Sequence, residues 1–106
     1  MNEKLMVEID EAYRKLSATV EGLAGADREL AEFVRRTRLD NAEALLEAKN
    51  ERTVNLYLEG MLDTDEYRVL SEAKDRAELD HGHARREVER LHLIVRLLGA
   101  NEGSTP

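Results

Sequence analysis

Cysteine and tryptophan are absent from this 106-residue chain, proline occurs once, at the last position, and aromatic residues make up only 4%. Without cysteine there is no disulfide framework and no thiolate for catalysis or metal binding. With so few aromatic side chains the core must be built from Leu, Val, Ala and Met, which suits a narrow seam between long helices. The sequence also lacks a Ser-centred glycine motif and a phosphate-binding glycine loop, so we expect no enzyme and no cofactor.

Long apolar runs are missing too, and the N-terminal segment MNEKLMVEIDEAY lacks the basic-then-apolar order of a signal peptide. We therefore expect a soluble, cytoplasmic protein that does not contact a membrane. The net charge of −7 speaks against general binding to nucleic acid, because phosphate contacts need a basic surface.

Charged residues, by contrast, are abundant at 37%, and the chain is rich in Ala, Leu, Glu and Arg. This composition is typical of helices. We expect an all-α protein with a single helical domain over residues 1–98 and a disordered tail over residues 99–106. A chain of this size gains stability by burying a face against a second copy.

The stretch LYLEGMLDTDEYRVL, residues 56–70, predicts a turn between two helices. Gly60 weakens the end of the first helix. Asp63 or Thr64 can begin the second, because both side chains accept hydrogen bonds from the free backbone N–H groups of a first helical turn.

The two helices should form a long antiparallel hairpin over about residues 28–60 and 65–98, with Gly99 ending the second. An additional N-terminal helix over about residues 3–22 would complete a three-helix or coiled-coil-like fold. The glycines of EGLAGAD, residues 21–27, make either a sharp turn or a kink before the hairpin.

Heptad spacing is clearest in the helix predicted over residues 65–98, where inward positions alternate at intervals of three and four. Pairing about the turn would place Val88 near Leu39. We expect the seam to form the interface with a second copy through Leu70, Ala77, His81, Ala84, Val88, Leu91, Val95 and Leu98. His81 within it would fix register or partner choice, or act as a pH switch.

The turn segment LYLEGMLDTDEY, within residues 46–80, resembles the coiled-coil motif in the C-terminal region of large serine recombinases. In that family a Leu-Tyr-x-x-Gly step, an apolar residue, an acidic turn and a Glu-Tyr or Glu-Phe pair join two antiparallel helices. The matching positions are Leu56, Tyr57, Gly60, Leu62, Asp63, Glu66 and Tyr67. The resemblance implies a hairpin that makes contacts between protomers. No catalytic domain, zinc-binding cysteines or DNA-reading module accompanies it, so it does not imply recombination.

Two Glu-x-x-His pairs, Glu78 with His81 and Glu89 with His92, are the sharpest chemical feature. Residues three apart project from one helix face, and ferritin-like di-iron proteins use such pairs together with carboxylates from neighbouring helices. A four-helix site needs two helices with this motif, and only a symmetric oligomer could supply the second. The alternative is chance pairing in a helix rich in glutamate, which we favour.

Arginines are the second feature. The predicted pairing brings arginines from both helices of the hairpin together at the end far from the turn. Such a cluster could bind phosphate groups through Arg35, Arg36, Arg38, Arg85, Arg86 and Arg90. The alternative, which we favour, is that they pair with acidic residues of the N-terminal helix or of the same helix in a partner copy.

We therefore expect a non-enzymatic helical interaction or oligomerisation module, an adaptor or small regulatory protein. Its partner would be itself, as a homodimer or larger assembly, another protein, or both. One alternative is a ferritin-like metal-binding oligomer that uses the Glu-x-x-His pairs. Another is a small helical regulator or inhibitor that binds nucleic acid or a nucleic-acid-binding protein.

Overall fold

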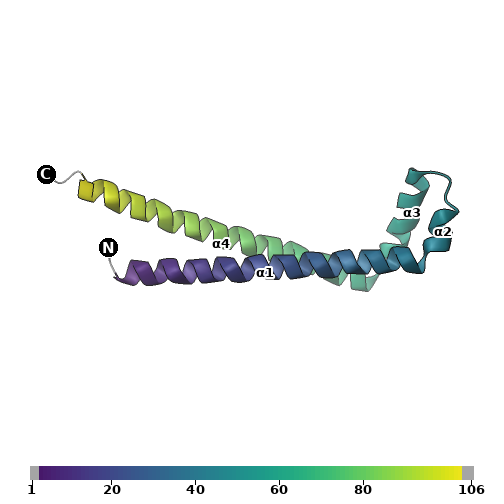
Figure 1. Ribbon diagram of the computed structural model, residues 1–106, viewed down its shortest axis with the longest axis horizontal. Helices are drawn as coiled ribbons and strands as arrows, with labels where there is room; N and C mark the ends of the chain where they lie inside the picture. Colours follow the sequence, from purple (N-terminus) through teal and green to yellow (C-terminus); the bar gives the residue numbers. More distant parts are fainter. Residues whose placement is uncertain (1–2, 104–106) are drawn as a thin grey trace. The chain divides into compact units, whose positions relative to one another are not determined.

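The structure, a computed structural model, describes residues 3–103, and every regular element in this range is a helix (Figure 1). The helices are α1 (Glu3–Asp40), α2 (Ala42–Leu46), α3 (Glu51–Leu62) and α4 (Asp65–Gly103). Contacts divide the chain into two units, the first with residues 3–23 and 77–103, the second with residues 24–76. In each unit a segment of α1 runs antiparallel to a segment of α4, so the predicted all-α hairpin class is confirmed.

The helix boundaries differ from the prediction, because α1 continues through Gly22 and Gly25 without a turn. Neither glycine has a positive φ, so neither uses the conformational freedom that a turn would require. Along α1 the buried and half-buried positions recur at spacings of four and three from Leu5 to Thr37. This unbroken heptad stripe keeps the helix continuous, since its packing outweighs about 1 kcal/mol lost at each glycine.

The break in the chain lies instead between residues 41 and 50, so the predicted helix over residues 28–60 is wrong. Its first part belongs to α1 and its last part to α3. Asn50 begins α3 by accepting a hydrogen bond of 2.9 Å from the backbone N–H of Thr53. The segment EAKNERT, residues 47–53, is polar except for Ala48 and has almost no apolar face to bury, which is why no long helix spans it.

The start of α4 agrees with the sequence, and its end does not. Thr64 caps the helix, because its hydroxyl accepts a hydrogen bond of 3.1 Å from the backbone N–H of Tyr67. At the other end α4 passes through Gly99 and continues to Gly103, so the predicted stop at Gly99 is wrong. Gly99 does not adopt the left-handed conformation of a helix C-cap. Of the predicted disordered tail, residues 99–103 are helical and residues 104–106 lie outside the described range.

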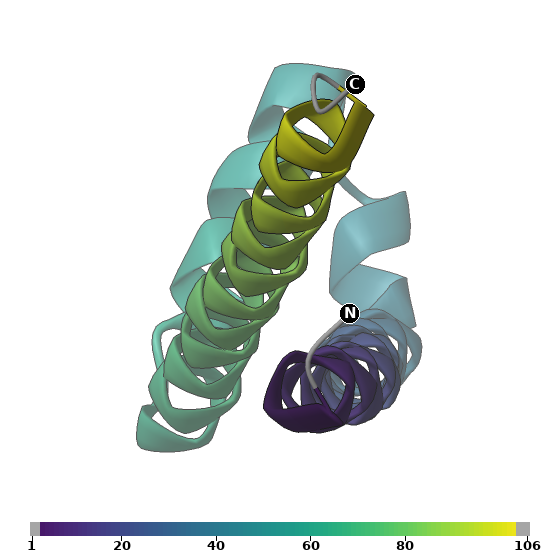
Figure 2. The same ribbon diagram turned by 90° about the vertical axis from the view of Figure 1, so that its left-hand side faces the viewer.

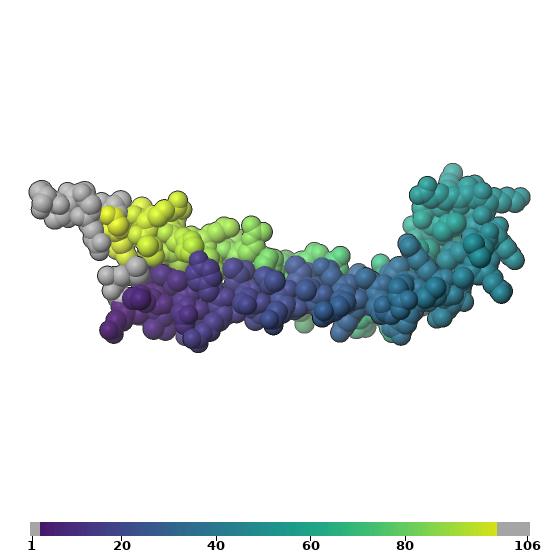
Figure 3. Space-filling view, viewed as in Figure 1, coloured from purple at the N-terminus to yellow at the C-terminus, as the bar shows by residue number. Residues whose placement is uncertain are grey.

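The core of the first unit is a small cluster between α1 and α4. Leu5, Ala12, Val88 and Leu91 are buried, and Leu91 is only 1% exposed. Figure 2 looks down α1 from its N-terminal end, with the C-terminal part of α4 passing beside it, and Figure 3 shows their side chains in contact. Val88 therefore packs against the start of α1, and its predicted position near Leu39 is wrong.

In the second unit the short helices α2 and α3 connect the end of α1 to the start of α4 (Figure 1). Leu58 of α3 is buried, and the rings of Phe33 and Tyr67 lie 6.3 Å apart between centroids. These contacts hold the two ends of the connection together. The segment that resembles the recombinase motif forms the turn from α3 into α4.

The continuous α1 helix can be tested at Gly22, where an added Cβ would meet no other atom within 4 Å. Gly22→Ala should raise the free energy of unfolding by about 0.5–1 kcal/mol, because alanine has the higher helix propensity. Thermal unfolding measures the change, and Ala18→Gly at another exposed α1 position should lower stability by a similar amount. A destabilised Gly22→Ala variant would indicate that the chain turns at this glycine.

Candidate interaction surface

The predicted seam of α4 faces α1 within the same chain. Val88 and Leu91 are buried, most of the other seam residues are half-buried, and Leu98 is exposed. A side chain that already packs within the hairpin is not free to form the main contact with another molecule. We therefore expect the contact with a second copy on the surfaces that flank this seam.

Two histidines of α4 make polar contacts with α1 in the first unit. The hydroxyl of Tyr13 lies 2.5 Å from Nε2 of His92, and the two rings are 5.6 Å apart between centroids. Thr19 donates a hydrogen bond to the carbonyl of Leu16, and its hydroxyl oxygen lies 3.4 Å from Nδ1 of His81. Both contacts join α1 to α4 and add polar contacts to the apolar packing between the two helices.

Within the part of the chain that the structure describes, the Glu-x-x-His residues do not gather into a metal site. Among the described residues no three His, Asp or Glu side chains gather as a ligand set. His81 and His92 instead contact hydroxyl groups of α1, and Glu78 and Glu89 are exposed. The metal hypothesis therefore requires ligands from another chain, as the sequence had suggested.

Metal content tests this hypothesis. Protein purified without a histidine tag and dialysed against Zn²⁺ or Fe²⁺ should hold less than a stoichiometric amount of either metal by elemental analysis. The physical reason is that one Glu-x-x-His pair supplies fewer ligands than either ion requires. Stoichiometric metal that is lost in the His81→Ala variant would contradict this expectation and assign Glu78 and His81 as ligands.

The six arginines proposed as an anion site do not form one cluster in either unit. Arg35, Arg36 and Arg38 belong to the second unit, whereas Arg85, Arg86 and Arg90 belong to the first. The predicted juxtaposition depended on the wrong pairing of the helices, since the neighbour of α4 is α1 and not a helix over residues 28–60.

Several of these arginines pair with residues of their own helix. Arg35 donates two hydrogen bonds to Glu32, at 2.9 and 2.5 Å, and Arg90 donates two to Glu87, at 3.0 and 2.7 Å. These hydrogen bonds, with the nearby positive charge, lower the pKa of Glu32 and of Glu87 from the ordinary value. The pairs are exposed, so they contribute little stability, but they show that arginine charge is partly neutralised locally.

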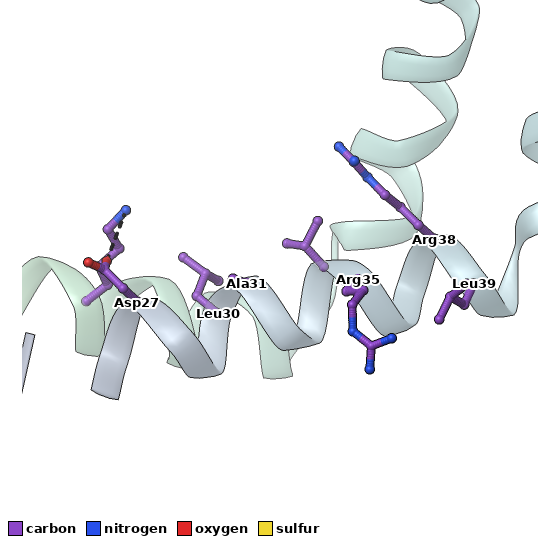
Figure 4. A pocket seen from close by; sticks show the side chains of 8 residues that line it. Asp27, Leu30, Ala31, Arg35, Arg38 and Leu39 are labelled. Atoms are coloured by element: carbon purple, nitrogen blue, oxygen red, sulfur yellow. Dashed lines mark ion pairs between the residues drawn. The ribbon is translucent and has the colours of Figure 1, made fainter. Parts of the chain in front are cut away.

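The second unit has an open groove of about 700 Å³ beside Lys74. Lys74 forms an ion pair of 3.5 Å with Asp27, and Leu30 and Val34 provide an apolar floor (Figure 4). Arg35 and Arg38 leave the helix in different directions in Figure 4, so they do not converge on one point. Nothing in this arrangement resembles a catalytic set of nucleophile, base and orienting group.

Exposed apolar side chains on α1 form the surface that the sequence analysis missed. Met6 is 58% exposed, Tyr13 45% and Val20 50%, and they recur at intervals of seven, which places them along one side of the helix. Leu5 and Ala12, one position earlier in the same repeat, point into the hairpin. The sequence shows one apolar stripe, and the structure divides it into an inner line and an outer line.

Comparisons with known proteins add no relative. No protein-family model, no curated protein and no solved structure matches the chain. Within residues 3–103, no helix combines the length and the apolar character that crossing a membrane requires. The function of the chain therefore has to be argued from its own surface.

Proposed function

We propose that the chain is a helical protein–protein interaction module that self-associates and has no catalytic activity of its own. The observation that supports this most directly is the imbalance between burial and exposure. Among the described residues five apolar side chains are buried, whereas thirteen large apolar side chains are exposed. Single exposed apolar residues are ordinary on protein surfaces, but a stripe of them on one helix is typical of an interaction site.

The accessible surface supports the same proposal. The chain exposes 8333 Å². A folded monomer of this mass exposes roughly 6,000 Å², so this chain has an excess on the order of 2,000 Å². A stable protein–protein interface removes about 800 Å² from each partner. The excess is therefore more than large enough for one standard interface.

Stability gives a physical reason for such an interface. The middle of the α4 seam contains Lys74, Ala77, His81 and Ala84, which are polar or small and offer little apolar area to bury. Burial contributes roughly 25 cal/mol per Å² of apolar surface, while ordering each residue costs on the order of 1–2 kcal/mol. A long hairpin with so thin a seam gains substantially when a partner covers its exposed apolar side chains.

The local resemblance to the hairpin motif of large serine recombinases points in the same direction, because that hairpin makes contacts between protomers. Here the motif occupies the turn from α3 into α4, where Leu56 and Tyr57 are also exposed. We propose a second copy of the chain as the first partner. A different helical protein that presents a similar apolar surface would be a further partner.

Absolute mass in solution tests the proposed function. Light scattering on a sizing column should give at least twice the chain mass at micromolar concentration, and dilution should lower both the mass and the melting temperature, because assembly stabilises the folded state by mass action. A concentration-independent monomer would contradict the proposed function.

A further inference from the structure

The first unit has a groove of about 620 Å³ that is lined by both of its helices, and we call it the Arg96 groove. Half-buried Ile9 of α1 and Val95 of α4 provide its apolar floor, and the exposed side chains of His92 and Arg96 line it as well. Sites for small molecules have volumes of roughly 300–1,000 Å³ and combine apolar walls with a few polar groups. The Arg96 groove therefore has the size and the composition of a small-ligand site.

Arg96 is the charged group of this groove. It is four residues after His92, so the two side chains project from the same side of α4. Within residues 3–103 no hydrogen bond or ion pair engages the guanidinium of Arg96. A guanidinium has five N–H donors and a permanent positive charge, and it binds a carboxylate through two parallel hydrogen bonds. Arg96 is therefore available to an anionic ligand.

The contact between Tyr13 and His92 provides a further donor beside Arg96. The Tyr13 hydroxyl lies 2.5 Å from Nε2 of His92. A tyrosine and a neutral histidine carry one polar proton each, and the hydrogen bond between them uses only one of the two. If the hydroxyl donates to Nε2, the proton on Nδ1 stays free. If Nε2 donates, the hydroxyl proton stays free. In both cases the pair retains one donor for a ligand.

The charges around the lining residues favour an anion. Asp10 of α1 lies 2.7 Å from Arg14 of the same helix. Glu89 of α4 lies 4.0 Å from Arg85. The described lining residues themselves include no carboxylate, so Arg96 makes the groove locally positive although the whole chain has a net charge of −7. Electrostatic complementarity therefore selects a negatively charged ligand.

The number and the kind of these groups restrict the ligand further. One arginine, rather than a row of them, fits a ligand with a single anionic group. An ionised carboxylate only accepts hydrogen bonds, which matches donors from Arg96 and from the Tyr13–His92 pair. The aliphatic floor of Ile9 and Val95 fits an alkyl chain. A carboxylate at the end of an alkyl chain combines these features.

We propose that the Arg96 groove binds a monocarboxylate with an unbranched alkyl chain, the chemical class of the fatty acids. The carboxylate accepts hydrogen bonds from Arg96 and from the Tyr13–His92 pair, and the alkyl chain covers Ile9 and Val95. This inference goes beyond the proposed interaction role. It does not rest on self-association, because one chain supplies every residue of the groove.

A series of matched ligands tests the chemistry of the site. Octanoate should shift the methyl signals of Ile9 and Val95 in nuclear magnetic resonance titrations, and it should bind at least fivefold more tightly than 1-octanol, which lacks the charge. Decanoate should bind about tenfold more tightly than octanoate, because two further CH₂ groups are buried. Acetate, which has no alkyl chain to bury, should cause no shifts in the same concentration range.

Charge reversal tests the role of Arg96. Arg96→Glu should weaken octanoate binding at least fivefold and should bind octylammonium more tightly than the wild type does, because the charge at the groove is inverted. The matched control is Arg86→Glu, which makes the same change in net charge at an exposed position that does not line the groove. This control should keep the wild-type affinity for octanoate. Circular dichroism checks that both variants keep their helicity.

Several results would overturn the inference. Octanoate could bind no more tightly than 1-octanol, or its shifts could fall mainly on residues outside the groove. Arg96→Glu and Arg86→Glu could weaken octanoate binding equally. These failures are distinct from failure of the proposed function, since a monomer that binds octanoate would contradict self-association alone. An oligomer that does not bind octanoate would overturn the ligand site alone.

Discussion

The thin seam between α1 and α4 is the constraint on which the rest of this protein depends. A helix in a two-helix hairpin can bury only the line of side chains that faces its neighbour, and here that line contains few large apolar residues. Of the residues whose side chains the structure describes, Leu91 alone is almost completely buried. Because aromatic residues are scarce, the hairpin has no large side chains with which to thicken this seam, and apolar surface remains exposed on the flank of α1.

Polar contacts in the first unit complement the thin seam. Tyr13 with His92 and Thr19 with His81 contribute little apolar burial, but they add polar contacts between the two helices. A small polar residue in a helical interface reduces stability and increases the specificity of register.

The sequence predicted the helical class, the turn before α4 and the capping role open to Thr64, because these follow from composition and from local hydrogen bonding. It did not predict the pairing of the long helices. Large apolar residues were weighted heavily, so Ala12, Thr19 and Ala26 were overlooked as seam positions although they complete an unbroken heptad stripe through the glycines. The short turn after α3 favoured the wrong neighbour for α4.

For a related reason, the sequence predicted an apolar stripe on the N-terminal helix but not which of its residues are exposed. Tyr13 and Val20 stood in the same apolar stripe as Leu5 and Leu16, and periodicity alone does not tell an inner line from an outer line. Only the position of α4 separates them, and that is tertiary information. The predicted proximity of the six arginines has a different origin. It was inferred from a hairpin between residues 28–60 and 65–98, which the structure does not have.

The most direct test of the central claim is an isotope-filtered nuclear Overhauser experiment on a dimer formed from one labelled and one unlabelled copy. If the account is right, protons of Tyr13 and Val20, which are exposed on the flank of α1, will show contacts in one copy to protons of the other copy. A dimer without intermolecular contacts from these two side chains, or the absence of any dimer, would contradict it.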